Sequence, residues 1–413
     1  MALKNSTLFF IPVWFDNFRS FTSEMAKMQV WDNVPTEEFT PRYFLNYVTQ
    51  LATSPDEFCV FNLRKDAVPN IYMCEDKLSL SDSTTITQVR FSAFGTGVGF
   101  LEYLVEYGDL SFDEITNFAY RFKKAKPYED TIIPEGKVCL YNASRMLLPK
   151  NVKSEIFFTR NAGFKNECHC FHMLYTDKDR YTPDQLEGYL RRLRRTQSTS
   201  FDICCHDDDY DMLFKPYTYD LWAGSQESLV NISTNAGDSN SNYFIENFKP
   251  SQLSIDYHFM YLMLLNQRYS AIQYISQIAR TSGMNAKQIE KLNQRIVKLK
   301  TTFAFNVVSD DQMYQNIYVR LYKVFDIDRL LKDIQDNEAQ MEILRNTSSA
   351  KTEKRSSHFL AGISLLSLFS ALIDAASYFD RWPALSHIST ILSLFSTIGI
   401  VVLCVVLFFG RSK

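Results

Sequence analysis

The sequence predicts an α/β domain over residues 1–250, a long helical stalk over 251–357 and a two-helix transmembrane hairpin over 358–410. Three observations predict this class. Strand-like and helix-like segments alternate up to about residue 250, and strand signals then stop. The C-terminal end holds two apolar runs, each about 20 residues long, which at helical rise match a bilayer core of roughly 30 Å.

The first 250 residues are expected to form a cytoplasmic, ligand-sensing α/β domain. Segments rich in Val, Ile and Phe predict strands at 8–15, 57–63, 71–73, 86–94, 99–107, 156–158 and 168–175. The 3–4 spacing of apolar residues predicts a helix over 109–124. Thr182 as N-cap and Pro183 at the first helical position predict another helix, which ends near Arg195. The Ser-, Asn- and Gly-rich segment 225–242 is expected to be an exposed loop.

The stalk is expected to consist of helices over 252–280 and 286–305, followed by one continuous helix. Ile317, Leu321 and Val324 recur at the spacing of one helical face. No Pro or Gly occurs between Asp311 and Gly362. The continuous helix is expected either to carry a shape change to a pore or to hold subunits together as a coiled coil.

The predicted hairpin consists of spans 358–379 and 388–409. Lys and Arg flank the hairpin on both outer sides, at positions 351, 354, 355, 411 and 413. The positive-inside rule then places both termini in the cytoplasm, and the chain is expected to be a multi-pass protein of the cell's inner (plasma) membrane, in contact with the lipid bilayer. A net charge of −3 gives no sign of direct nucleic-acid binding.

A polar stripe in the first span predicts pore-lining residues: Ser364, Ser367, Ala371 and Asp374 lie on one helical face. An ionisable residue inside a span normally faces a cavity or a partner. In a symmetric oligomer Asp374 would form a ring of carboxylates, which favours cations. The alternative is that Asp374 lies near the outer headgroups and only caps the span.

Two segments are candidates for ligand binding. The first is the glycine run of Gly95, Thr96, Gly97 and Gly99, which is either a tight turn or a place where the backbone approaches a ligand. The second is a cluster of Arg191, Arg192, Arg194 and Arg195, which is either a solvated face or a patch that binds phosphate.

Cysteine and histidine supply the remaining candidate. Cys168, Cys170 and His172 fall on one face of a predicted strand, so they are weak candidates for zinc ligands, although Cys is often simply buried. The eight cysteines are expected to be free thiols. No nucleophile elbow, P-loop, metalloprotease or kinase motif occurs, so the chain is not expected to be an enzyme.

An α/β domain, a stalk helix and a C-terminal hairpin together resemble the CorA-type two-transmembrane family. That resemblance implies a homopentamer whose first span lines the pore. The hallmark of the family is Gly-Met-Asn at the outer end of that span. Here Gly283-Met284-Asn285 comes too early, and Ser377-Tyr378-Phe379-Asp380 stands where the hallmark belongs.

The missing hallmark makes the chain more similar to the CorA membrane effectors associated with type III CRISPR systems. The run from Phe94 to Leu101 also resembles these chains. The resemblance implies an antiviral ion channel, gated by a nucleotide second messenger such as S-adenosylmethionine-AMP bound to the cytoplasmic domain. The ligand is then nucleotide-derived, and no cofactor is otherwise expected. The alternative is a divalent cation transporter of the magnesium type.

Overall fold

The computed structural model describes residues 4–72, 84–123, 138–156, 168–201, 212–279, 284 and 286–337, together with the single positions 360, 364, 367, 371, 391, 394, 396 and 399. The chain divides into two compact units. The first unit comprises residues 1–278 and 292–336, and the second comprises residues 279–291 and 337–413. The elements of the first unit position the candidate site.

A ten-stranded mixed sheet forms the centre of the first unit, in the order β10-β11-β12-β9-β1-β6-β5-β3-β2, with β8 also paired to β1. β9 and β12 are parallel, whereas the other pairs in this sheet are antiparallel. A separate two-stranded sheet joins β4 and β7. The strands are β1 (Ser6–Phe15), β2 (Trp31–Asn33), β3 (Phe58–Leu63), β4 (Ile71–Tyr72), β5 (Thr84–Phe94), β6 (Val98–Tyr107), β7 (Val138–Cys139), β8 (Ser154–Ile156), β9 (His169–Thr176), β10 (Met212–Tyr217), β11 (Asp220–Gly224) and β12 (Ser228–Thr234).

Helices cover both faces of this sheet. They are α1 (Phe18–Lys27), α2 (Asn46–Thr53), α3 (Phe112–Lys123), α4 (Leu140–Met146), α5 (Pro183–Leu193), α6 (Ser239–Asn247), α7 (Lys249–Ser251), α8 (His258–Ile278), α9 (Ala286–Lys298) and α10 (Gln312–Val324). Short 3₁₀ turns are η1 (Thr36–Phe39) and η2 (Lys65–Ala67), and π-helical turns are η3 (Gln252–Tyr257) and η5 (Leu299–Phe303).

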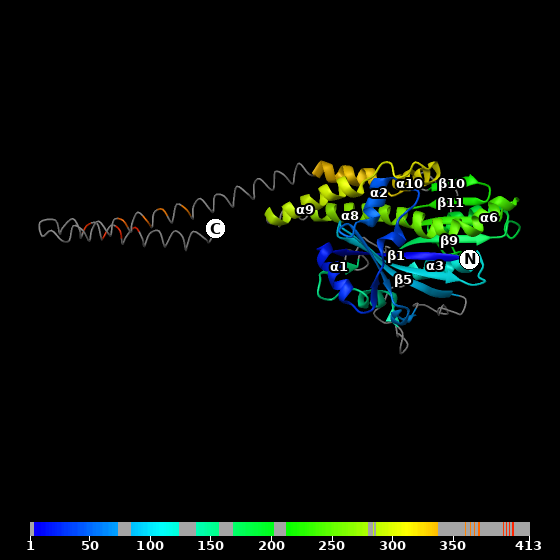
Figure 1. The fold of residues 1–413 in the computed structure, drawn as a ribbon, viewed down its shortest axis with the longest axis horizontal. Coiled ribbons are helices and arrows are strands. Elements are labelled where there is room, and N and C mark those ends of the chain that lie inside the picture. The colour runs from blue at the N-terminus through cyan, green and yellow to red at the C-terminus, as the bar shows by residue number, and fades with distance from the viewer. Residues whose placement is uncertain are drawn as a thin grey trace. The chain divides into compact units, whose positions relative to one another are not determined.

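Successive side chains of β1 point to opposite faces of the sheet, so helices pack on both faces and the sheet lies between two helical layers. Phe9 on one face stacks on Phe122 of α3 at 4.0 Å, in a core that also takes in α1, α4 and α5. Phe10 on the opposite face contacts Tyr261 of α8 at 5.4 Å. β1 is buried along its whole length, because both of its faces are covered by helices. Figure 1 shows α3 and α8 on opposite sides of the sheet.

The structure corrects the predicted fold class and localisation. Among the described residues no helix is both long and apolar enough to cross a membrane. This finding contradicts the predicted transmembrane hairpin, the multi-pass inner-membrane location and the ion-channel assignment. The described chain is instead a large mixed sheet with helices. Of the two predicted spans, 358–379 and 388–409, only single positions belong to the described residues.

Two other segments differ from the sequence-based expectation. The expected continuous helix from Asp311 is interrupted after α10, where Asp326 adopts a left-handed φ of 55°. Aspartate tolerates that conformation better than most residues. The segment 225–242, expected to be a loop, instead contains strand β12 and the beginning of α6.

Candidate anion-binding site

A cavity of about 510 Å³ lies beside α4 and β8. Tyr141 and Arg145 come from α4, residues 148–150 from the turn after it, and residues 152–156 from the approach to β8 and from β8 itself. All of the lining residues therefore come from one short stretch of chain, 141–156.

Both walls of this cavity are held by the core. Leu140 and Ala143 of α4 are buried, and Ser144 lies 3.0 Å from the hydroxyl of Tyr103 in β6. β8 is fixed because it pairs with the C-terminal half of β1, where Val13 is opposite Ile156. The Trp31 indole donates to the carbonyl of Leu147 at 3.0 Å, which fixes the turn between the two walls. The cavity is therefore largely pre-formed.

The cavity is basic. Its lining contains three cationic side chains, Arg145, Lys150 and Lys153, against one carboxylate, Glu155. All four residues are exposed. Within the described part of the chain neither Arg145 nor Lys150 takes part in an ion pair. Lys153 lies over the Trp14 ring at 5.5 Å and is 4.0 Å from the Asp16 carboxylate.

This arrangement suits an anion that also carries a flat ring. Arginine offers a planar fork of donors that matches phosphate oxygens, and lysine offers a mobile point charge. Tyr141, which is half-buried, supplies an aromatic ring at the same cavity. The volume falls in the range of about 300–1,000 Å³ that is typical of small-molecule sites.

The glycine run lies elsewhere and forms the hairpin between β5 and β6. Gly97 has a φ of +92°, and a Cβ there would lie 2.8 Å from the carbonyl of Phe15. The N–H groups of Gly95 and Gly97 donate to the carbonyls of Glu57 and Phe94. Thr96 is buried and donates to Asn266 of α8 at 2.6 Å. Gly99 faces Phe91 and the carbonyl of Ser92. The run thus contains a tight turn in which the N–H groups of Gly95 and Gly97 already have acceptors.

The arginine cluster does not gather around one anion among the described residues. Arg191 pairs with Glu187 at 3.0 Å, and Arg192 donates to the carbonyls of Ser198 and Phe201. Arg194, at the end of α5, is only 1% exposed. Arg195 follows it with its N–H bonded to the carbonyl of Arg192. These contacts of Arg191 and Arg192 stabilise α5 and the turn that follows it.

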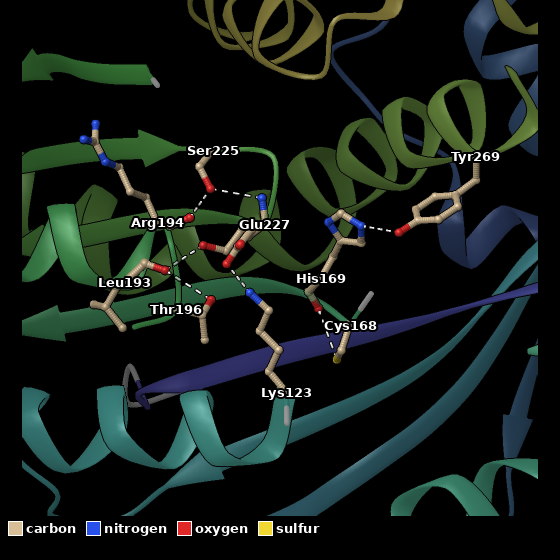
Figure 2. A network of polar contacts seen from close by, with 10 residues as sticks. Lys123, Cys168, His169, Leu193, Arg194, Thr196, Ser225, Glu227 and Tyr269 are labelled. Carbon is tan, nitrogen blue, oxygen red and sulfur yellow. Dashed lines mark hydrogen bonds and ion pairs between the residues drawn. The ribbon is translucent and has the colours of Figure 1, made fainter. Parts of the chain in front are cut away.

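Figure 2 shows the polar network where α3 and α5 end and β9 begins. Lys123 forms an ion pair with Glu227, and the Ser225 hydroxyl donates to the carbonyl of Arg194. On the opposite face of β9, His169 Nε2 lies 2.6 Å from the hydroxyl of Tyr269. Burial lowers the pKa of His169 well below 6.5. These contacts join α3, α5 and α8 to the interior of the sheet, where the neighbouring strands β9 and β12 begin.

Cys168, Cys170 and His172 line the α3 face of β9 and are all buried. Burial raises the pKa of Cys168, whereas for Cys170 hydrogen bonds from Cys168 and His172 outweigh burial and lower the pKa. One thiol of the pair therefore loses its proton more readily than the other. His172 Nδ1 lies 2.9 Å from the Thr7 hydroxyl.

A metal does not fit this strand. Alternate strand residues are about 6.6 Å apart, so three of them extend over about 13 Å and cannot converge on one ion. In the part of the chain that the structure describes, no group of three or more His, Cys, Asp and Glu side chains could hold a metal ion.

Three of the four predicted pore-lining residues are described, and all three are exposed helical residues. The Ser364 hydroxyl donates to the carbonyl of Leu360 at 2.9 Å, and that of Ser367 to the carbonyl of Ser364 at 2.8 Å. Ala371 continues the same face. Asp374 lies outside the described residues.

The basic cavity was not predicted from the sequence. The signal that could have found it is the set of Arg145, Lys150 and Lys153 within nine residues that include Pro149. Comparison with known proteins adds no relative: no protein-family model matches this chain, and neither a curated protein nor a solved structure matches it significantly.

Proposed function

We propose that this chain is a binding protein for an anionic ligand of nucleotide type, held in the cavity beside α4 and β8. The observation that carries the proposal is the excess of three cations over one carboxylate around a cavity of about 510 Å³. Arg145 and Lys150 are its main phosphate donors. Because hydrogen bonds from charged donors are the stronger class, contributing about 1.5–3 kcal/mol each, two of them suffice to select an anion.

The ring of Tyr141 favours a nucleotide over inorganic phosphate. An aromatic side chain beside a base gains stacking energy of about 1–3 kcal/mol. The sequence resemblance to type III CRISPR effectors names S-adenosylmethionine-AMP as the first candidate, and the antiviral role and the homopentamer stay predictions of that resemblance. The channel and the cation transporter are not part of the proposal, because both require the contradicted membrane hairpin.

Calorimetry on the full chain tests the proposal. The probes are ATP and S-adenosylmethionine-AMP, with uncharged adenosine as the ligand control. We expect the charged probes to bind and adenosine to bind at least ten-fold more weakly. Because the donors are exposed, we also expect the affinity for the charged probes to fall as salt rises.

Substitutions locate the site. Arg145→Ala and Lys150→Ala should each weaken binding about ten-fold, which corresponds to about 1.4 kcal/mol. Lys178→Ala is the matched control, since Lys178 is also exposed but lies in the turn between β9 and α5. Absence of binding by either charged probe, or an equal loss in the Lys178 variant, would contradict the proposal.

A further inference from the structure

Asp16 connects the basic cavity to helix α9. It stands between the end of β1 and Asn17, the N-cap of α1. Its N–H donates to the carbonyl of Lys153 at 3.4 Å, and its carboxylate lies 4.0 Å from the Lys153 ammonium. Its carbonyl accepts a hydrogen bond from the guanidinium of Arg295 in α9. One residue therefore contacts both a cation of the cavity and a helix outside it.

The part of α9 that belongs to the first unit is anchored by few polar contacts. Leu292 and Ile296 are buried, and Lys298 pairs with Glu57 at 2.8 Å. Arg295 supplies another polar contact to the described residues, through the carbonyl of Asp16. Among the described residues, the Asp16 carbonyl thus provides one of the polar contacts that hold residues 292–298, next to the Asp16 carboxylate.

We infer that the Asp16 carboxylate competes with the ligand for Lys153. Through this competition, Asp16 couples ligand binding in the cavity to the contact between α9 and the end of β1. This inference rests on the proposed function. Without ligand, the Asp16 carboxylate attracts Lys153. An anion in the cavity attracts Lys153 instead. The Asp16 carboxylate can then turn to the guanidinium of Arg295, which already donates to the carbonyl of the same residue and has further N–H donors. Ligand binding thus strengthens the contact between α9 and the end of β1.

The energetics favour such an exchange. The side chains of Lys153 and Asp16 are 71% and 42% exposed, and pairs this exposed contribute little. A phosphate group carries up to about two negative charges and outcompetes a single carboxylate for Lys153. Coupling between two sites is reciprocal. If the ligand strengthens the contact of α9 with the end of β1, that contact raises the affinity for the ligand by the same factor.

The first test is the ATP affinity of the full-length Asp16→Asn variant. Asparagine keeps the backbone contacts but removes the competing charge, so we expect ATP to bind about two- to five-fold more tightly. Asp56→Asn is the matched control, because Asp56 is an exposed aspartate of the same unit and pairs with Arg19. Equal affinities for the two variants would overturn the inference.

The second test is hydrogen exchange over residues 292–298 with and without saturating ATP. We expect ATP to slow exchange there in the wild type and in Asp56→Asn, and to leave it unchanged in Asp16→Asn. The same slowing in Asp16→Asn would overturn the coupling. If the wild type binds no nucleotide, the proposed function is wrong. If it binds nucleotide but Asp16→Asn and Asp56→Asn do not differ in ATP affinity or in the effect of ATP on exchange, only the role of Asp16 is wrong.

Discussion

A buried pair of ionisable residues, Glu102 and His258, connects helix α8 to the sheet. Glu102 of β6 accepts a hydrogen bond from Ser92 and lies 2.7 Å from His258 Nε2, and both side chains are fully buried. A carboxylate in such a place requires partners, because burying an unpaired charge is costly. This pair fixes the first turn of α8 against β6.

Removing one partner should therefore be expensive. We expect His258→Leu to lower the free energy of unfolding by about 3–5 kcal/mol, because it leaves the Glu102 carboxylate without its ring partner. Urea denaturation measures the loss. The double variant Glu102→Leu/His258→Leu should recover part of it, since the buried Glu102 carboxylate is then removed as well. A loss below about 1 kcal/mol in the single variant would show that the pair contributes little.

His169 should make stability depend on pH. Its pKa in the folded chain is well below 6.5, chiefly because it is buried. Below pH 6.5 the unfolded chain therefore binds a proton that the folded chain does not. Stability accordingly falls as the pH drops from 6.5 toward the folded pKa, by up to about 1.4 kcal/mol per pH unit.

Denaturation at about pH 7 and about pH 5.5 measures this effect. His169→Gln keeps a polar partner for Tyr269 but does not titrate, so we expect its stability to change less between the two pH values. Tyr269→Phe is the control, because it removes the hydroxyl and leaves the titrating ring. An unchanged pH dependence in His169→Gln would show that this histidine is not the source.

Among the helices and strands, the β5–β6 hairpin and α5 each contain a glycine, and the two differ in the room that is available for a Cβ. Gly97 has a φ of +92° and no room for a Cβ, whereas nothing lies within 4 Å of a Cβ at Gly188 in the middle of α5. We expect Gly97→Ala to destabilise by about 1–3 kcal/mol and Gly188→Ala to stabilise by up to about 1 kcal/mol. Thermal denaturation of both variants tests this pair. Equal shifts would contradict the role of the turn.

Local signals predicted some elements and failed at others for a physical reason. Thr182 caps α5 as expected, and the structure adds a capping box in which Thr182 and Gln185 exchange hydrogen bonds within one turn. β12 was missed because its polar residues suggested a loop. Their partners lie outside that segment: Asn231 donates to Asp220 at 2.7 Å, and Ser228 to the carbonyl of Leu193 at 2.6 Å. No local pattern contains those partners.

The candidate site could be predicted from the sequence only in its residue types. Of the two interpretations of the arginine cluster at 191–195, one was a phosphate-binding patch. In the structure Arg191 and Arg192 have partners within α5 or the turn that follows it. Arg145, Lys150 and Lys153 come together because β8 pairs with β1, which is about 140 residues earlier in the chain. That pairing joins residues far apart in the chain, so no local sequence pattern predicts it. The hairpin prediction relied on hydropathy alone, and the finding on the described helices contradicts it.

For the whole molecule, the central claim is that a nucleotide-type anion binds beside α4 and β8. The most direct measurement is photolabelling of the full chain with an azido-adenine analogue of ATP, followed by mass spectrometry of its peptides. We expect the label to fall within 138–156, excess ATP to remove it, and Arg145→Ala/Lys150→Ala to abolish it. The proposed site would be wrong if the label that excess ATP removes fell on the glycine run at 95–99 or on 191–195, with none on 138–156.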